Sequence, residues 1–407
     1  MDFVEAETIL SDVMPVVYLF LTRLWLCLPI TVVLFLFDTT VTVALQNLEA
    51  SAESLDVSVS ASLTGTTPQR GCNASKPDLS PCAKSRLNRD SYAPDFIYRP
   101  GRKKINDKYG RIQDCQSKMI IRPGDEFWWV SSRHLPLNSC GDFDLCIYRF
   151  LDGQVSQKTM VDLKNAHQSN PDLINFVYAH ENRADLNKAE MRFWQTYNIL
   201  INQAVDAPSV RFIFFSWPAD EVRGQIRDVK AKATICDHHA FYFAHFLYQI
   251  QDFNRVSLGG YSYGARLTIN ALTLCGGGCV NGRSVPQDQR FQKPRLRALF
   301  VASALPNSGL GCAAYQHLDH VTFLNNSQDG VLRFFGLLSA NRTQALGRTG
   351  VCSTAGFPDR GGKIRQLDVA CIAGKSHKIE DYFKSESLRQ IIRDTIFWRD
   401  VAAEKPR

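Results

Sequence analysis

A serine flanked by glycines is the sequence feature with the clearest chemical meaning. The segment Gly260-Tyr261-Ser262-Tyr263-Gly264 follows a short apolar run at residues 256–258 and precedes a helical pattern at residues 265–274. Gly-x-Ser-x-Gly between a strand and a helix is typical of a nucleophile elbow. There the serine adopts a strained backbone conformation, and the glycines let strand and helix approach closely. We therefore predict that Ser262 is a nucleophile. The alternative is an ordinary glycine-rich turn.

A serine nucleophile needs a base, and His377 is the best placed of the nine histidines. It is the only histidine after His320, and it lies in a loop beyond the last predicted strand. When a nucleophile elbow opens a helix of an α/β sheet, the chain order of the catalytic groups is serine, acid, histidine. We therefore predict that His377 accepts the serine proton.

The acid is expected between these two residues, at the end of a strand. Residues 321–324 form an apolar run that leads through two asparagines to Asp329. Asp359 lies in a loop rich in Pro and Gly, Asp368 falls at the start of a predicted strand, and Asp381 is more typical of a surface charge. The sequence therefore favours Asp329 as the residue that orients His377.

An oxyanion also needs a backbone N–H from the loop after an earlier strand. The predicted strand at residues 174–179 ends at His180, and Asn182 lies in the loop beyond it. We expect the N–H of Asn182 to face the substrate oxygen and His180 to be a structural loop residue.

Asp237, His238, His239 and His245 include residue types that bind metals and lie close together in the sequence. Asp237 and His245 are too far apart for a helical ligand set of the His-Glu-x-x-His kind, so a helix surface is the favoured interpretation. No CxxC motif occurs in the sequence. We therefore expect neither a metal nor a cofactor.

The pattern around these residues predicts the fold that positions them. Short apolar runs alternate with helical stretches, which is typical of a mostly parallel sheet with helices on both faces. The two earliest strands would form an antiparallel edge through Gly141. This predicts a three-layer α/β fold. The predicted strands are residues 126–131, 145–150, 174–179, 211–215, 256–258, 297–302, 321–324 and 367–372, and the predicted helices are residues 186–205, 224–251, 265–274 and 385–401.

The N-terminal third has a different character. Residues 14–37 carry one charge, Arg23, and this apolar stretch predicts a signal peptide or a single-pass membrane anchor within residues 1–38. Residues 39–91 contain no Phe, Tyr or Trp, are rich in Ser and Thr, and are expected to be a disordered linker. The catalytic domain would then comprise residues 92–407. These features favour an exported protein, anchored in the membrane or released as a periplasmic or secreted form.

Charge and cysteine content narrow the partners. The net charge of +7 is small for 407 residues and includes no long basic run, so nucleic acid is not expected as a partner. Twelve cysteines fit an exported chain without defining a disulfide scaffold. Cys275 and Cys279, which flank three glycines, are the most plausible local disulfide.

The motifs together resemble the α/β-hydrolase superfamily, the serine esterases and lipases. The similarity is strongest to a little-characterised branch of membrane-anchored or exported bacterial hydrolases, and it extends over about residues 127–382. This resemblance implies Ser262, Asp329 and His377 as the catalytic triad, with the N–H groups of Tyr263 and Asn182 as the oxyanion hole. One residue departs from the family pattern: Glu181 stands where such loops usually have glycine. A glutamate would be costly there if the backbone needed a positive φ. The motifs that carry the resemblance are residues 180–183, 215–218, 260–266, 276–278, 329–332 and 345–350.

The sequence therefore predicts a serine hydrolase that cleaves carboxylic ester-like bonds through a covalent acyl-enzyme. A small-molecule or lipid-like ester would be its substrate, and the N-terminal segment would contact the membrane. The alternative is a catalytically inactive hydrolase-fold module, tethered to the membrane for binding, for which Glu181 is the main argument. A structural envelope protein is a third and less supported hypothesis.

Overall fold

The computed structural model describes residues 121–137, 143–291, 296–338, 342–351 and 363–399. The predicted signal peptide or anchor, the linker, the Gly141 turn and Asp359 lie outside these residues. Among the residues that are described, no helix combines the length and apolarity needed to cross a membrane.

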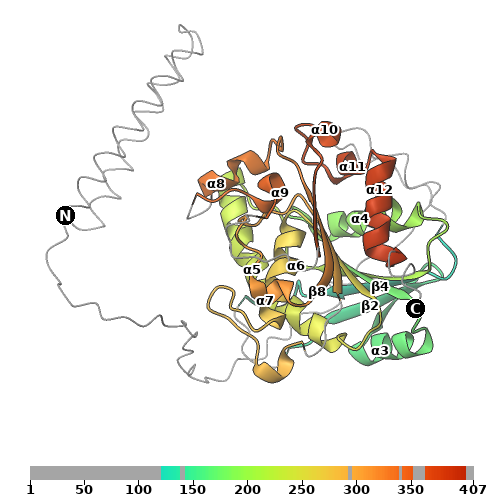
Figure 1. Cartoon of the computed structure of the whole chain (residues 1–407). Helices are drawn as coiled ribbons and strands as arrows, with labels where there is room; N and C mark the ends of the chain where they lie inside the picture. Colours follow the sequence, from blue (N-terminus) through green and yellow to red (C-terminus); the bar gives the residue numbers. More distant parts are fainter. Residues whose placement is uncertain (1–120, 138–142, 292–295, 339–341, 352–362, 400–407) are drawn as a thin grey trace, which may run out of the picture. The chain divides into compact units, whose positions relative to one another are not determined.

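A nine-stranded sheet forms the centre of the described domain (Figure 1). Its strands lie in the order β3-β2-β1-β5-β4-β6-β7-β8-β9. β2 runs antiparallel to both of its neighbours, and every other neighbouring pair is parallel. The predicted mostly parallel sheet with an antiparallel edge is therefore confirmed. The strands are β1 Glu126–Ser131, β2 Cys146–Leu151, β3 Gln154–Lys158, β4 Ile174–Ala179, β5 Val210–Ser216, β6 Val256–Tyr261, β7 Leu296–Val301, β8 Leu318–Asn325 and β9 Ile364–Asp368.

Helices cover both faces of this sheet (Figure 1). Two long helices, α5 and α6, pack against each other on one face, whereas α4 and α12 lie on the other. The arrangement is the predicted three-layer α/β fold. The helices are α3 Met160–Ser169, α4 Leu186–Tyr197, η2 Asn198–Asn202, α5 Gln225–Gln249, α6 Tyr263–Cys275, η3 Gln287–Gln289, α7 Cys312–Tyr315, η4 Leu332–Phe334, α8 Phe335–Leu338, α9 Leu346–Thr349, α10 Ala370–Ala373, α11 Ile379–Tyr382 and α12 Glu386–Phe397.

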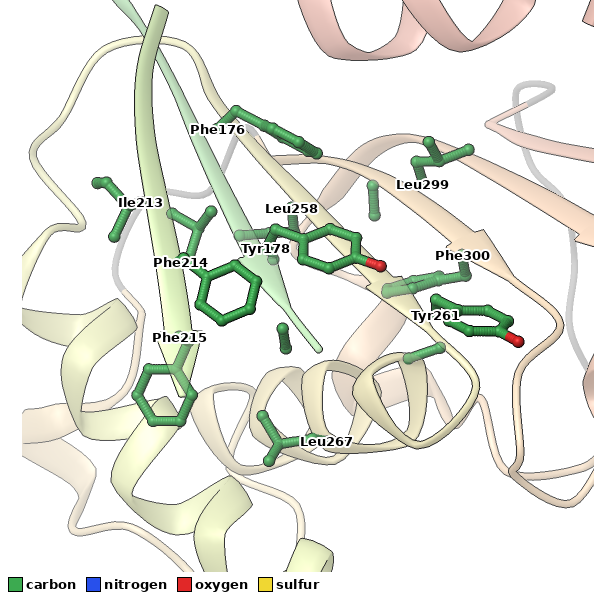
Figure 2. Packing of buried hydrophobic residues seen from close by; sticks show 14 of the residues in the cluster. Phe176, Tyr178, Ile213, Phe214, Phe215, Leu258, Tyr261, Leu267, Leu299 and Phe300 are labelled. Carbon is green, nitrogen blue, oxygen red and sulfur yellow. The ribbon is translucent and has the colours of Figure 1, made fainter. Parts of the chain in front are cut away.

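The central strands are mostly apolar because helices cover them on both sides. Every residue of β4, β5, β6 and β7 is buried. Figure 2 shows part of the resulting core, in which Tyr178 of β4 lies near Phe214 of β5, with ring centroids 6.0 Å apart. This rigid layer fixes the strand ends from which the loops of the candidate site emerge.

Two of these buried strands carry an arginine, Arg211 in β5 and Arg297 in β7. Arg211 of β5 is fully buried, and its guanidinium donates to Glu126 Oε2 at 2.8 Å and to Asn175 Oδ1 at 2.9 Å. A third bond reaches the carbonyl of Ala166 at 2.8 Å. These bonds compensate the arginine for lost hydration, and they connect three strands to the end of α3.

The last described helix, α12, is tied to the strand that precedes Ser262. The Ser257 hydroxyl of β6 donates to the Ile396 carbonyl at 2.9 Å, and the Trp398 indole donates to the Ser257 oxygen at 2.8 Å. α12 also contacts β7 and β8. It therefore covers the face of the sheet beneath the nucleophile strand.

Most strand predictions agree with the structure to within a few residues, but the last one is wrong. β9 ends at Asp368, and Ala370–Ala373 form the short helix α10 instead of continuing a strand. Asp368 consequently lies at the end of its strand and not at the start. The polar strand β3 and helix α3 were not predicted.

The strand order reverses direction beside β4, which lies between β5 and β6. From β4 the chain adds β5 on one side, and then β6 through β9 on the other. In open α/β sheets, ligands bind beyond the carboxyl ends of the strands at such a switch point. The loops after β4 and β6 are the ones that contain Asn182 and Ser262.

Candidate active site

Ser262 occupies a sharp strand-to-helix turn. β6 ends at Tyr261 and α6 begins at Tyr263, so Ser262 alone joins them, with φ 55° and ψ −115°. The Ser262 N–H donates to the Val301 carbonyl at 2.9 Å, and the Ser262 carbonyl accepts from Ala304 at 3.1 Å. Such a left-handed conformation is costly for a residue with a side chain, and these bonds to β7 and the loop after it help to hold it.

The glycine after the serine permits the close contact that this turn requires. A Cβ on Gly264 would lie 2.0 Å from the Ala179 carbonyl oxygen, a distance that no real Cβ contact allows. α6 therefore begins against the end of β4, beside the loop that contains Asn182. The elbow predicted from Gly260 to Gly264 is present in the structure.

His377 lies within hydrogen-bonding distance of the serine. Its Nε2 is 3.1 Å from Ser262 Oγ, and its Nδ1 is 2.6 Å from Asp329 Oδ2. Tyr261 donates its hydroxyl hydrogen to the His377 carbonyl. The structure thus brings the three predicted residues into one hydrogen-bonded chain.

The loop that carries His377 is fixed by an asparagine. The Asn326 side-chain amide donates to the carbonyls of Gly374 and Ser376 at 2.9 and 3.0 Å. The Gly330 N–H donates to the Lys375 carbonyl at 3.0 Å. Because Asn326 and Gly330 flank Asp329, the acid and the histidine loop are held to the same segment.

Asp329 is fully buried and its two oxygens have different partners. Oδ1 accepts from the N–H groups of Val331 and Leu332, both at 2.8 Å. Oδ2 accepts from His377 and from the Tyr382 hydroxyl, the latter at 3.1 Å. Burial by itself raises the pKa of Asp329. The hydrogen bond and charge of His377, together with the two backbone donors, outweigh burial and leave the pKa below its ordinary value.

Tyr382 was not identified from the sequence. Burial, and next the Asp329 charge, raise the pKa of its phenol, so Tyr382 remains protonated and acts as a donor. No sequence motif connects Tyr382 with Asp329, and only the folded structure shows that the two residues are in contact.

Asp368 and Asp381, the described alternatives for the catalytic acid, have other partners. Asp368 accepts from the N–H groups of Ser327 and Ala370, at 3.1 and 3.0 Å. Asp381 forms an ion pair with Lys384 at 2.7 Å. The carboxylate that is hydrogen-bonded to the His377 imidazole is that of Asp329.

The two predicted oxyanion donors border the same cavity as Ser262 and His377. Tyr263 is the first residue of α6, so its N–H has no acceptor within the helix. The side chain of Asn182 donates to Asp228 at 3.0 Å, which anchors the loop after β4 to α5. The structure thus places both residues at the cavity that Ser262 lines.

Glu181 does not carry the backbone strain that was expected of it. Arg183, and not Glu181, has a positive φ in this loop, at 62°. The Glu181 carboxylate pairs with Arg192 Nε at 2.6 Å, and Arg192 also reaches Glu380 at 3.5 Å. The glutamate therefore joins the loop after β4 to α4 and α11, without the glycine-specific conformation that was considered for it.

His180 and His239 lie in the protein interior. His180 is buried, stacks on Phe214 and Trp217, and lies 2.8 Å through Nδ1 from the Glu181 carbonyl. Asp237, His238, His239 and His245 were predicted to lie on a helix surface. This prediction is wrong for Asp237 and His239, both of which are buried. Asp237 accepts two bonds of 2.7 Å from Arg266.

The predicted local disulfide does not form. Cys275 is a buried free thiol whose Sγ lies 3.6 Å from the Ala244 carbonyl oxygen. Since this thiol is a hydrogen-bond donor within the α5–α6 contact, it is not joined to Cys279.

A cavity of about 940 Å³ opens over Ser262. This volume lies within the range of small-molecule sites. Its lining comes from the loop after β4, from α4 and α5, and from the segment after Asp329. The lining residues are Glu181, Asn182, Arg183, Lys188, Met191, Arg192, Ile226, Val229, Lys230, Tyr261, Ser262, Tyr263, Gly330, Val331, Phe334, Leu337 and His377.

Comparison with known proteins yields structural matches alone. No protein-family model matches the chain, and no curated protein does. The catalytic core of acetyl xylan esterase from Trichoderma reesei matches at 18% identity, covering 55% of this chain and 98% of its own, with a TM-score of 0.31. A second acetylxylan esterase matches at 15% identity over 56% of this chain and 97% of its own, with a TM-score of 0.29. Esterase B from Lactobacillus rhamnosis matches at 13% identity over 69% of this chain and 87% of its own, with a TM-score of 0.30.

Matches at this level carry no information about activity. The chain's own sheet order, its switch point beside β4 and its strand–Ser262–helix turn define the class of fold. It is a three-layer α/β-hydrolase fold.

Proposed function

We propose that the protein is a serine hydrolase that cleaves carboxylic ester-like bonds through a covalent acyl-enzyme. The observation that carries this proposal is the chain of hydrogen bonds from Ser262 through His377 to Asp329, at 3.1 and 2.6 Å, beneath an open cavity. A histidine with a purely structural role would not require a serine hydroxyl beside Nε2 and a buried carboxylate beside Nδ1.

The reaction follows from the positions of the atoms. Ser262 Oγ would attack the carbonyl carbon while its proton moves to His377 Nε2. Asp329 would hold the imidazole and stabilise its positive charge. The N–H groups of Tyr263 and Asn182 would donate to the oxyanion. Collapse would expel the alcohol, which takes the proton from His377. Water would then attack the acyl-enzyme by the same route and release the acid.

An ester is the proposed substrate because an alcohol is an easier leaving group than an amine. The inactive-module hypothesis depended on Glu181, and the pairing of Glu181 with Arg192 accounts for this residue without loss of the relay. No observation on the described residues favours that second function.

A fluorophosphonate probe tests the proposal directly. The native chain should be labelled on Ser262, Ser262→Ala should not be labelled, and Ser169→Ala on α3 should be labelled like the native chain. Hydrolysis of nitrophenyl esters of graded chain length should show the same pattern. Absence of labelling in the native chain, or equal labelling of Ser262→Ala, would refute the enzyme hypothesis.

Export remains a proposal that depends on the sequence of residues 1–38. The polar and Ser/Thr-rich residues 39–91 would then separate the membrane from the catalytic domain. The mass of the protein recovered from cells would show whether the segment is cleaved. Its behaviour in alkaline extraction of membranes would show whether it is an anchor.

A further inference from the structure

One wall of the cavity over Ser262 is apolar and open to solvent. Ile226 of α5 is 62% exposed, and Val331, Phe334 and Leu337, which follow Asp329, are 58%, 45% and 80% exposed. We call these four residues the apolar rim. The described residues include only five other exposed large hydrophobic side chains, spread over the rest of the domain. Clustering of this kind marks a surface that binds an apolar group.

Four other residues of the cavity lining are cationic. Arg183, Lys188 and Arg192 line the cavity from the loop after β4 and from α4, and Lys230 lines it from α5. The single acidic lining residue is Glu181. Because Glu181 already pairs with Arg192 at 2.6 Å, no unpaired carboxylate of the lining would repel an anion.

The two arginines are compensated within the protein, but the two lysines are not. Arg183 pairs with the buried carboxylate of Asp228 at 2.8 Å. Lys188 lies 3.9 Å from Asp185, and both side chains are 48% exposed, so this pair is weak. Within the described part of the chain, no carboxylate lies within ion-pair distance of Lys230. Lys188 and Lys230 therefore leave positive charge available at the cavity.

A purely structural role does not account for this pair of lysines. Both side chains are exposed, so neither supports the core. Ile226, Val229 and Lys230 are spaced at i, i+3 and i+4 on α5, which places the cation on the same helix face as the apolar side chains. The cavity thus offers apolar and cationic groups together to one ligand.

We infer that the substrate is an anionic amphiphile: an ester whose acyl chain lies against the apolar rim and whose alcohol portion carries a negative charge that faces Lys188 and Lys230. This inference rests on the proposed ester hydrolysis. The acyl chain would displace water from the four exposed side chains, and the lysines would favour an anion over a neutral analogue of equal length.

Binding to the inactive Ser262→Ala chain tests this inference without hydrolysis. The probes are octyl sulfate, below its micellar concentration, and 1-octanol, which has the same chain without the charge. Octyl sulfate should bind about five- to tenfold more tightly, as expected for two exposed ionic contacts. The preference should shrink as salt is added.

Substitutions test the lysine contacts and the apolar-rim contacts separately. Combined Lys188→Gln and Lys230→Gln should abolish the preference for octyl sulfate, and Lys158→Gln on β3 should retain it. Val331→Ser should weaken binding of both probes, whereas Val161→Ser, a valine of α3 with 64% exposure, should not.

Three results would overturn the inference: equal affinity for the two probes, a preference that persists without both lysines, or equal loss from the two valine substitutions. These failures differ from failure of the proposed function. If fluorophosphonate labels Ser262 and the lysine-dependent preference is absent, the hydrolase stands and the substrate class is wrong. If the preference is present and labelling is absent, the cavity binds an anionic amphiphile without hydrolysing it.

Discussion

Replacing Asp329 by asparagine should disable the relay through the tautomer of His377. In the native chain, Oδ1 accepts two backbone N–H groups at 2.8 Å, and Oδ2 accepts the imidazole hydrogen at 2.6 Å. An asparagine would keep its carbonyl oxygen on the backbone donors, so its NH₂ group would face Nδ1. Nδ1 would then have to accept a hydrogen bond, and the imidazole proton would move to Nε2.

An imidazole protonated on Nε2 cannot accept the proton of Ser262. The same tautomer change in known triads lowers kcat by about 10⁴, which corresponds to about 5.5 kcal/mol of transition-state stabilisation. We expect a loss of this size in nitrophenyl ester hydrolysis, with the fold intact because Oδ1 keeps its partners. The rate of fluorophosphonate labelling should fall in parallel.

Asp368→Asn is the matched control. Its carboxylate also accepts backbone N–H groups at a strand end, but it has no imidazole partner, so activity should remain within about threefold of native. The reasoning would be refuted if Asp329→Asn retained a tenth or more of native kcat, or if Asp368→Asn were the crippled variant.

Three further substitutions probe the framework of the site. Gly264→Ala should lower the unfolding free energy by about 1–3 kcal/mol or more, because its Cβ would lie 2.0 Å from a β4 carbonyl, whereas Gly311→Ala, which meets open space, should change it little in urea unfolding. Tyr382→Phe should lower kcat about tenfold with an unchanged KM, since the acid loses one hydrogen bond; an unchanged kcat would contradict this role. Arg211→Met should cost about 3–5 kcal/mol of stability by stranding the buried Glu126 charge, and the double variant with Glu126→Gln should recover part of it. Burial raises the pKa of Glu126, but the hydrogen bond and charge of Arg211 lower it overall. The stability from this pair is therefore present above the unfolded-state pKa, near 4.3, and is lost as pH falls through the folded-state value. Glu126→Gln should remove this acid-sensitive part of the urea midpoint.

The sequence predicted the relay because its residues follow strands whose patterns are strong. Ser262 and Asp329 come after mostly apolar runs, and the carboxyl ends of parallel strands meet at one edge of a sheet. His377 was identified by chain order, even though the strand before it was misplaced. That strand was misplaced because the mostly apolar residues 367–372 overlap the short helix α10, and a run of this length does not distinguish strand from helix.

Other features depend on contacts that no periodicity encodes. Asp237 was expected on a helix surface because its spacing from His245 does not fit a helical metal-ligand set. It is buried because Arg266 and Asn270, from the neighbouring helix, satisfy its oxygens. Similarly, the sequence does not show which residue of the loop after β4 takes the positive φ; Glu181 was suspected, and Arg183 has it. The cavity walls also required the fold, since they join α4, α5 and the segment after Asp329.

The hydrogen bonds that join Ser257 to Ile396 and Trp398 can form only late in synthesis, because these two residues follow Ser257 by about 140 positions. The nucleophile strand leaves the ribosome well before Asp329, His377 and the helix that covers it. At typical rates of synthesis, this interval is on the order of ten seconds. During that time Ser262 has neither its base nor the packed sheet that holds its elbow. Under the proposed mechanism, a nascent chain is therefore chemically silent until nearly all of the described domain has been synthesised.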